Sequence, residues 1–506
     1  MEAFSGTTGV SMFPRFHQRY LALPQRMRAE CQPTPVAEPR VVAFNHALAE
    51  ALGFDREAFN AEQAAQILSG NQVPEGVTPV AAAYAGHQFG NFVPQLGDGR
   101  ALLLGELSHQ DGALREVQLK GAGRTPFSRG GDGRAPLGPV LREYLVSEAM
   151  FALGVPTTRA LAAVTTGERV YRQPPEPGAV LTRVASSHLR VGTFQYFASR
   201  NDVEAVKLLV ELAIERHYPE LAGLPEDEQA MALLDAVIGR QANLVARWKG
   251  LGFIHGVMNT DNCAISGETI DYGPCAFMDS YHPETVFSSI DERGRYAWVN
   301  QPVIAQWNLA RFAKTLLALM DTDQQRAIER ATAAIEGFSD RHEQAWSDVL
   351  RSKLGLTRDA EPEDGSDLAL GEKWLEVMAA GKVDFTLSFG ELVAAVEPGA
   401  DETPLHQRFN SSDALDAWLS RWRERLHAEG QSSEVLRSRI ESANPLVIPR
   451  NHLVERAIRA AADQQDFGPF ETLLAAVTQP WTSPEDQSLL QPPLSNERVL
   501  RTFCGT

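Results

Sequence analysis

Short apolar runs separated by glycine-rich polar segments characterise the first third of the chain. Such runs lie around residues 101–104, 116–120 and 178–183, and polar loops at 97–100 and 121–133 lie between them. Short apolar runs bounded by turn-forming residues are typical of β-strands. The pattern therefore predicts that this part of the chain contains a twisted sheet.

The hydrophobic pattern changes to a helical period beyond about residue 200. Apolar residues recur three or four positions apart in 203–216, 231–248 and 305–320, which predicts amphipathic helices. An acidic stretch with Pro and Gly at 359–367 predicts a loop or linker, and helical spacing resumes after it. The chain is therefore predicted to be an α+β protein, with a mixed α/β amino-terminal part and a largely helical remainder.

The length of the chain indicates more than one packed unit. Its 506 residues exceed the size of roughly 250–300 residues at which a single hydrophobic core stops growing. We expect an amino-terminal lobe at 1–195 that carries loops rich in glycine and arginine and a carboxyl-terminal lobe at 196–350. An acidic linker and a helical extension packed on the second lobe are expected at 351–506.

Composition restricts the partners and the location. The net charge of −18, from 47 basic and 65 acidic residues, opposes nonspecific attraction to nucleic acid or to an anionic membrane. No apolar run reaches membrane-spanning length and no signal-peptide pattern occurs, so a cytoplasmic location is expected. The four cysteines show no CxxC spacing, which argues against a zinc knuckle or a disulfide framework. Oligomeric state is left open.

One segment departs from this acidic balance. Between residues 115 and 142 there are six basic and two acidic residues, and five glycines lie among them at positions 121 to 133. Glycines let the backbone approach a ligand closely and direct N–H groups at phosphate oxygens. The segment is a candidate phosphate cradle, but it matches neither usual glycine-loop motif, and a surface loop is the alternative. The six basic residues are Arg115, Lys120, Arg124, Arg129, Arg134 and Arg142.

Lys120 is a separate candidate because it ends the predicted strand at 116–120, beside the glycine-rich loop. Downstream, apolar spacing between Pro139 and Gly154 predicts a helix that carries Glu143. A strand lysine oriented by a helix glutamate is how protein kinases hold the α- and β-phosphates of ATP. An ordinary surface lysine and a solvated glutamate are the alternative.

Acidic and amide side chains gather in a short segment after residue 254. Runs at 251–254, 264–265 and 269–270 are apolar and flank it, which predicts a strand–loop–strand that brings Asp261, Asn262 and Asp271 together. Carboxylate and amide oxygens are ligands that Mg²⁺ prefers, and Mg²⁺ takes only one or two carboxylates from the protein. The segment therefore predicts a magnesium site, with tight-turn chemistry as the alternative.

The order of these candidates along the chain narrows the interpretation. A strand lysine, a helix glutamate, an asparagine seven residues after His255, and then Asp271-Tyr272-Gly273 follow one another like the corresponding parts of a protein kinase. The order predicts a kinase-like two-lobed fold with a helical C-lobe and a helical carboxyl-terminal extension. Because Val257 occupies the position of the usual catalytic-base aspartate, Asp261 is the available substitute.

Five further motifs are Tyr84–Gly90, Gln95–Arg100, Gln118–Pro126, Gly131–Arg134 and His255–Gly273. With these motifs the chain resembles the selenoprotein O family, the kinase-like proteins that transfer AMP to proteins. The resemblance extends across most of the chain. It implies that ATP binds in the reverse sense to a kinase, with its α-phosphorus facing the acceptor. AMP would then be transferred to a Ser, Thr or Tyr hydroxyl of a protein, and pyrophosphate would leave.

The resemblance also implies roles for individual residues. Lys120 would hold phosphates and be oriented by Glu143. Asn262 and Asp271 would hold Mg²⁺, or Mn²⁺ in its place, and Asp261 would accept the proton of the acceptor hydroxyl. A conventional phosphotransferase and a noncatalytic nucleotide-binding scaffold are the alternatives, and use of UTP is left open. The residues implied to contact ATP are Gly97, Gly99, Arg100, Lys120, Asp132, Gly133, Arg183, Arg190 and Asp271.

Two cysteines suggest redox regulation. Cys275 lies just after Asp271-Tyr272-Gly273, where kinases place their activation loop, and Cys504 lies almost at the carboxyl terminus. In eukaryotic members of the resembled family a selenocysteine occupies that terminal region. A regulatory disulfide between Cys275 and Cys504 is therefore a hypothesis, with two unlinked thiols as the alternative.

Overall fold

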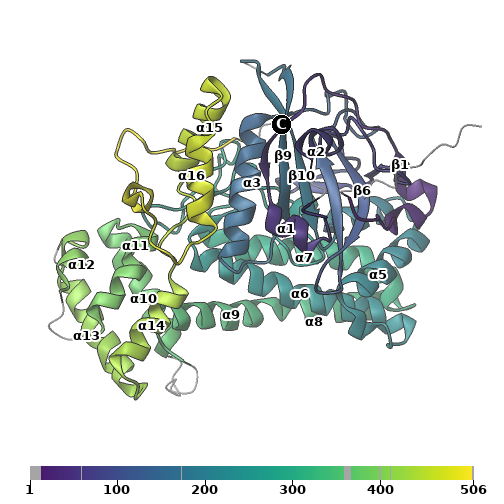
Figure 1. The fold of residues 1–506 in the computed structure, drawn as a ribbon. Coiled ribbons are helices and arrows are strands. Elements are labelled where there is room, and N and C mark those ends of the chain that lie inside the picture. Colours follow the sequence, from purple (N-terminus) through teal and green to yellow (C-terminus); the bar gives the residue numbers. More distant parts are fainter. Residues whose placement is uncertain are drawn as a thin grey trace, which may run out of the picture.

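The computed structural model of the chain contains two regions of different architecture (Figure 1). The amino-terminal region is built around an antiparallel sheet, and the region after it is helical. This confirms the α+β class expected from the hydrophobic pattern. The residues that the structure describes are 13–57, 60–172, 174–357, 366–397, 401–410 and 412–503.

The sheet has eight strands among the described residues, in the order β1-β3-β6-β7-β10-β9-β2, with the short β8 beside β10. The strand pairs in it are antiparallel. The three strands expected from the sequence are β6, β7 and β10, which are neighbours in the sheet. The strands are β1 (Arg28–Glu30), β2 (Arg40–Phe44), β3 (Val80–Ala82), β6 (Ala101–Ser108), β7 (Leu114–Lys120), β8 (Ala135–Pro136), β9 (Arg159–Val170) and β10 (Glu176–Ala185).

The register of the central strands positions the polar side chains that matter for the site. Lys120 ends β7 and lies opposite Ala101 of β6 and Leu181 of β10. Two residues earlier, Gln118 lies opposite Arg183 of β10. Because side chains alternate between the faces of a strand, Gln118 and Lys120 project from the same face.

Helix α3 (Leu137–Ala152) packs against β9 and β10 of the sheet. Pro139 lies in its first turn, where a missing N–H costs no helical hydrogen bond, and Gly154 follows its end with a φ of +75°. Two carboxyl-terminal helices, α15 (Asn451–Gln464) and α16 (Gly468–Val477), pack against α3 from outside the sheet (Figure 1). The last part of the chain therefore returns to the amino-terminal region.

The helices expected at 203–216, 231–248 and 305–320 are present as α5, α6 and α7. Each is longer than the apolar pattern. Asp202 caps α5 by accepting from the Ala205 N–H. Helix α6 packs against both α7 and α9. The helices are α4 (Val191–Ala198), α5 (Val203–His217), α6 (Glu226–Gly250), α7 (Gln301–Met320), α8 (Gln324–Glu336) and α9 (Phe338–Lys353).

A second hydrophobic core lies between α9 and the helices that follow it. Trp374 and Trp418 are buried there with their ring centroids 4.3 Å apart. Most of the linker expected at 359–367 lies outside the described residues, and α10 begins at Ser366. The helices around this core are α10 (Ser366–Gly381), α11 (Phe385–Gly390), α12 (Thr403–Arg408), α13 (Asp413–Ala428) and α14 (Ser433–Ala443).

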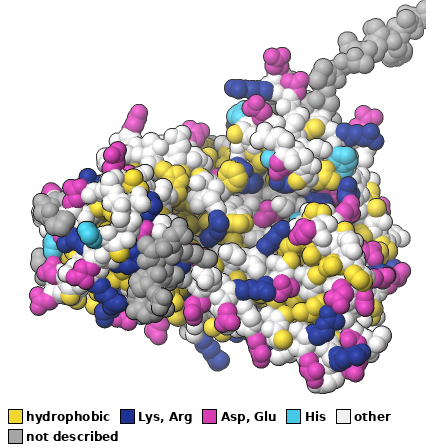
Figure 2. Space-filling view, turned by 90° about the horizontal axis from the view of Figure 1, so that it is seen from below, with side chains coloured by type: hydrophobic (Ala, Val, Ile, Leu, Met, Phe, Trp, Pro, Cys, Tyr) yellow, Lys and Arg dark blue, Asp and Glu magenta, His cyan; other side chains and the backbone are white. Residues whose placement is uncertain are grey.

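The surface carries charges of both signs. Figure 2 shows basic and acidic side chains interspersed on the face that it displays. Within the described ranges, none of the helices is both long enough and apolar enough to span a bilayer. The remaining helices and strands are α1 (His46–Ala51), α2 (Ala61–Leu68), β4 (Gly86–Gln88), β5 (Asn91–Val93), β11 (Phe253–Ile254) and β12 (Ala276–Phe277).

Candidate active site

A cavity of about 600 Å³ lies between the sheet and the polar segment that follows β11. Its walls come from β6, β7, β10, α3 and the loops between them. The structure brings together here all the residues that the sequence singled out for catalysis, nucleotide contact or metal binding. They are Gly97, Gly99, Arg100, Lys120, Asp132, Gly133, Glu143, Arg183, Arg190, Asp261, Asn262 and Asp271.

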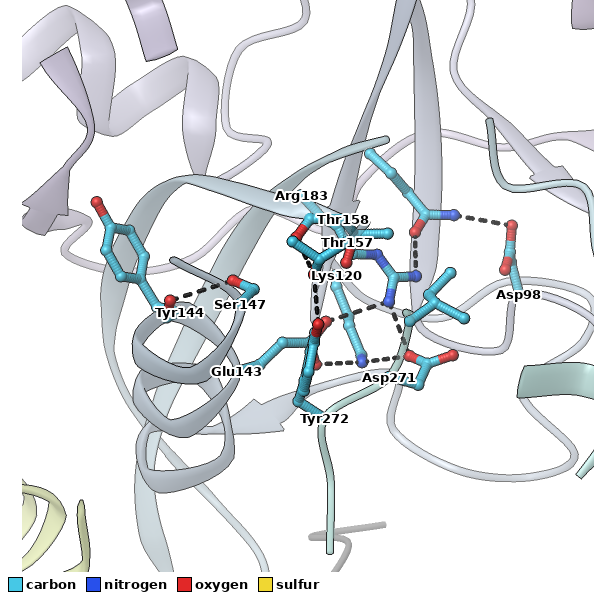
Figure 3. Close-up of polar contacts among 12 residues, drawn as sticks. Asp98, Lys120, Glu143, Tyr144, Ser147, Thr157, Thr158, Arg183, Asp271 and Tyr272 are labelled. Atoms are coloured by element: carbon cyan, nitrogen blue, oxygen red, sulfur yellow. Dashed lines mark hydrogen bonds and ion pairs between the residues drawn. The ribbon is translucent and has the colours of Figure 1, made fainter. Parts of the chain in front are cut away.

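Lys120 is the centre of an ion-pair cluster (Figure 3). Its Nζ lies 2.6 Å from Oε2 of Glu143, on helix α3, and 2.7 Å from Oδ1 of Asp271. The pair between Lys120 and Glu143 therefore has the geometry that the kinase-like order predicted. Both carboxylates are largely shielded from solvent, so their attraction to the ammonium group is weakly screened.

Arg183 lies in the same cluster and is held on two sides. Its Nη1 donates to Glu143 at 3.1 Å and to Asp271 at 2.7 Å. Its Nη2 donates to Oε1 of Gln118 at 2.7 Å, and Gln118 donates in turn to Asp98 at 3.1 Å (Figure 3). The sequence did not single out Asp98 for a role. Its position in the Gln95–Arg100 motif was the available signal.

Asp271 is enclosed by three cations. Arg190 Nη1 lies 2.7 Å from Oδ2, while Lys120 and Arg183 contact Oδ1. Burial alone would raise the pKa of the Asp271 carboxyl, but the three cations hold this pKa well below its ordinary value. Asp271 has a φ of +65°, an uncommon conformation for a residue with a side chain. The same Arg190 nitrogen donates to the backbone oxygen of Asp261 at 2.9 Å.

The strand–loop–strand prediction for residues 251–270 is wrong about which strands pair with each other. Strand β11 pairs with β12, which follows Asp271, and not with the apolar residues before Asp271. Ala264 instead forms a bridge with Arg190, and Thr269 forms one with Thr157. These residues are buried because they join the segment to the sheet region, and an apolar pattern alone does not reveal which segment pairs with which.

The carboxylate of Asp261 is buried beneath the β4–β5 hairpin. Among the described residues, Oδ1 has no hydrogen-bond partner, and Oδ2 receives only a long contact of 3.4 Å from Nε2 of Gln88. Gly86 packs so closely that a Cβ atom there would lie 2.5 Å from Oδ1. Burial raises the pKa of the Asp261 carboxyl to about 6.

The β4–β5 hairpin is fixed to the segment that carries Thr260 and Asp261 by a ring of hydrogen bonds. The His87 N–H donates to Oγ1 of Thr260 at 2.7 Å, and that hydroxyl donates to Oε1 of Gln195 at 2.7 Å. Nε2 of Gln195 lies 2.9 Å from Nδ1 of His87 and closes the ring. The Tyr84–Gly90 motif carried no role in the sequence prediction, and the structure shows that it covers Asp261.

The chemistry of Asn262 and Asp271 fits a magnesium ion. Nδ2 of Asn262 donates to the Val257 carbonyl at 2.9 Å, which leaves the amide oxygen for a ligand. Asp271 supplies a carboxylate in the same cavity. No group of three or more His, Cys, Asp and Glu side chains suited to a metal occurs in the described part of the chain. A magnesium site here would depend on one carboxylate, one amide and substrate phosphates.

The basic run between residues 115 and 142 does not act as one cradle, which corrects that expectation. Lys120, Arg129 and Arg134 line the cavity. Arg142 is directed away, to the Cys275 carbonyl and to Glu455, and Arg115 lines a different cavity. A strand and a helix separate these residues in space, whereas charge counting treats them as one cluster.

The disulfide hypothesis joins Cys275 to Cys504, and Cys504 lies outside the described residues.

Comparison with known proteins shows the family of the chain. A family model described as "Protein adenylyltransferase SelO" matches residues 12–478. The chain is 55% identical over 496 residues to the protein nucleotidyltransferase YdiU of Rhodopseudomonas palustris strain HaA2, covering 98% of this chain and 99% of that protein. It is 54% identical over 492 residues to the protein nucleotidyltransferase YdiU of Rhizobium etli, covering 97% of each.

The matches define the class of the protein as an enzyme, a protein nucleotidyltransferase. More particularly, the chain belongs to the SelO family of protein adenylyltransferases. The resemblance inferred from the motifs is therefore confirmed.

Proposed function

We propose that this enzyme transfers AMP from ATP to a Ser, Thr or Tyr hydroxyl of a protein substrate and releases pyrophosphate. The proposal includes a protein kinase-like arrangement, in which the sheet region and the helical region are two lobes with the nucleotide between them. It rests on the presence of Lys120, Arg183, Arg190 and Asp261 in one cavity. Membership of an adenylyltransferase family supports the choice of ATP and of the group transferred.

The buried guanidinium groups support a reversed nucleotide. Arg183 and Arg190 are only 2% and 3% exposed, so they lie at the inner end of the cavity. Arginine binds phosphate oxygens through two parallel N–H groups, which suits the terminal phosphates of ATP. With those phosphates inside, the α-phosphorus faces the acceptor. Arg100, Asp132 and the cavity glycines would contact the rest of the nucleotide.

Asp261 would act as the general base. The acceptor oxygen attacks the α-phosphorus, and the bond from that phosphorus to the oxygen bridging to the β-phosphate breaks, so pyrophosphate leaves with the bonding electrons. Oδ2 of Asp261 takes the hydroxyl proton, because Oδ1 is packed beneath Gly86 and has no room for a ligand. The weak contact from Gln88 leaves Oδ2 a free lone pair.

Asn262 and Asp271 would hold Mg²⁺ or Mn²⁺. Such an ion supplies charge neutralisation on the phosphates. When phosphates enter, Lys120, Arg183 and Arg190 gain anionic partners other than Asp271, which frees its oxygens. Positioning and charge stabilisation by these cations supply most of the rate enhancement in transfers of this kind.

Incubation with ATP labelled at the α- or at the γ-phosphate tests the proposal. Protein labelled from the α-phosphate only, together with released pyrophosphate, is the expected result. Label from the γ-phosphate only would assign a conventional phosphotransferase, which the pair of Lys120 and Glu143 serves equally well. No label from either position would favour a noncatalytic scaffold. The same assay with α-labelled UTP decides whether a second nucleotide serves as donor.

A further inference from the structure

A second and larger cavity, of about 1050 Å³, lies where the sheet region meets helix α6. One wall comes from the end of β10 and the connection from α3 to β9, and the other comes from one face of α6. It shares none of its lining residues with the catalytic cavity. The volume suits a small organic ligand, for which cavities of roughly 300–1,000 Å³ are usual.

The walls of this second cavity are positively charged in a chain of net charge −18. Arg240 donates to the carbonyls of Ser266 at 2.9 Å and His217 at 2.5 Å, and Arg247 donates to the Gly154 carbonyl at 2.6 Å. Neither has a carboxylate within 4.0 Å in the part of the chain that the structure describes. The Arg240 guanidinium also lies 4.0 Å from the centroid of the Tyr218 ring. Carbonyls and a ring do not neutralise a charge, so both guanidinium groups contribute positive charge to the wall, which favours an anion.

The other charged groups in the walls do not cancel these two. Arg115 pairs with Asp111 at 2.6 Å, and Arg159 pairs with Glu148, which lies behind the wall, at 2.7 Å. Glu268 accepts from the hydroxyl groups of Ser186 and Ser266 at 2.8 and 2.9 Å. His109 contacts Asp111 at 2.9 Å. The charge of Asp111 is therefore balanced by Arg115. Glu268 has uncharged donors and offsets one positive charge, so the wall remains net positive.

Apolar side chains complete the cavity. Leu48, Val155 and Leu244 contribute to the walls, together with the ring of Phe151, which is 53% exposed. The guanidinium of Arg159 lies 3.3 Å from the centroid of that ring. A large exposed aromatic residue in a concave wall offers contact area to the flat apolar part of a ligand.

We propose that this cavity is a second ligand site, which takes a small phosphate monoester with an aromatic body. The phosphate would lie against Arg240 and Arg247 of α6, and the aromatic part would lie against Phe151. Arginine recognises phosphate through paired charge-assisted hydrogen bonds, which are stronger than neutral ones. The site is independent of the proposed catalytic function, because no catalytic residue takes part in it.

The cavity wall is joined to the catalytic segment by hydrogen bonds. The Thr269 N–H donates to the Pro156 carbonyl at 2.9 Å, and the Thr158 N–H donates to the Thr269 carbonyl at 3.0 Å. The Tyr272 hydroxyl bonds to Thr157 (Figure 3). A ligand that contacts residues 154–159 is therefore connected through these hydrogen bonds to the segment that carries Asp271.

Titration calorimetry of the full chain with phenyl phosphate, and separately with inorganic phosphate, tests the proposal. Phenyl phosphate should bind more tightly than inorganic phosphate. Arg247→Glu should weaken its binding by about tenfold or more, since one of two phosphate contacts is replaced by a repulsion. Asn243→Trp, which fills the cavity from the exposed face of α6, should have the same effect without changing a charge. Arg421→Glu, on the exposed face of α13, is the matched charge control and should leave binding unchanged.

Two further observations separate this site from the catalytic cavity. Lys120→Ala should bind phenyl phosphate as tightly as the unmodified chain does, whereas Arg247→Glu should bind it more weakly. Hydrogen exchange of the backbone should slow at 240–247 and 266–272 when phenyl phosphate binds. Absence of binding to the unmodified chain would overturn the proposal. The proposal would also be overturned if binding disappeared in Lys120→Ala but persisted in Arg247→Glu and Asn243→Trp. Binding that does not slow hydrogen exchange in these segments would overturn it as well.

Discussion

Arg190 and Asp271 are joined at 2.7 Å, and the same Arg190 nitrogen holds the Asp261 carbonyl at 2.9 Å. One buried guanidinium thus connects the proposed base to the proposed metal ligand. Lys120 and Arg183 occupy the other oxygen of Asp271. The relative positions of Asp261 and Asp271 are therefore fixed in part by an arginine outside the segment that carries them.

Glu143→Gln should lower the rate of AMP transfer by about 10²-fold, the scale on which misplacement of a catalytic group acts. The change removes the charge that holds Lys120 at 2.6 Å, so the ammonium group shifts toward Asp271. Initial rates with α-labelled ATP measure the effect. Glu148→Gln, in the same helix but paired with Arg159, is the matched control. Equal losses in both variants would show that helix stability, and not Lys120, is responsible.

Asp261→Asn should lower AMP transfer by about 10²–10⁴-fold, the usual contribution of a general base. The amide keeps the volume of the buried carboxylate but cannot accept the proton. ATP affinity, measured by calorimetry, should stay within about twofold, because Lys120, Arg183 and Arg190 are unchanged. Turnover close to that of the unmodified enzyme would remove Asp261 from the proposed role.

Gly86→Ala should impair transfer although it adds one methyl group. The new Cβ would lie 2.5 Å from Oδ1 of Asp261 and 3.0 Å from Leu96, so the hairpin or the carboxylate has to move. A loss of at least about tenfold in kcat, with the thermal midpoint little changed, is expected for a displacement of catalytic geometry. Gly390→Ala adds its methyl group to open space and serves as the control. Normal turnover by Gly86→Ala would mean that the hairpin does not constrain Asp261.

The parts of the fold that depend on local pattern were predictable from the sequence. The strands at 101–104 and 116–120 and the helix at 231–248 each carry their period within one segment, so the residues themselves indicate the element. The pair of Lys120 and Glu143 was predictable for a different reason, since their order matches a known arrangement of parts.

Long-range pairing was not predictable in the same way. The partner of β11 is β12, beyond Asp271, and the nearer apolar residues around Ala264 pair with Arg190 instead. An apolar residue in the sequence indicates that the position is buried, but it does not indicate which segment packs against it. The closure of the β4–β5 hairpin over Asp261 has the same character, because it depends on side-chain bonds between residues more than 170 positions apart, such as His87 and Thr260.

The free energy of unfolding should increase between pH 7 and pH 9 because of Lys353. Its ammonium group is buried beside Phe389, with Nζ 4.3 Å from the ring centroid, and burial lowers the pKa of Lys353 to about 7. Above that pH the folded chain releases the proton, whereas the unfolded chain keeps it up to its ordinary pKa near 10.5. The unfolded state then binds more protons, so the free energy of unfolding increases with pH, by about 2 kcal/mol over this range.

Urea unfolding of the full chain at pH 7, 8 and 9 measures this increase. Lys353→Met should raise stability at pH 7, because no charge is then buried, and should remove most of the pH dependence. A smaller slope of the same sign should remain from Lys249, whose pKa burial lowers to about 8. Lys373→Met, which alters an exposed lysine paired with Glu376, should leave the slope unchanged. A slope in Lys353→Met equal to that of the unmodified chain would show that Lys353 stays protonated in the folded state, with its charge compensated.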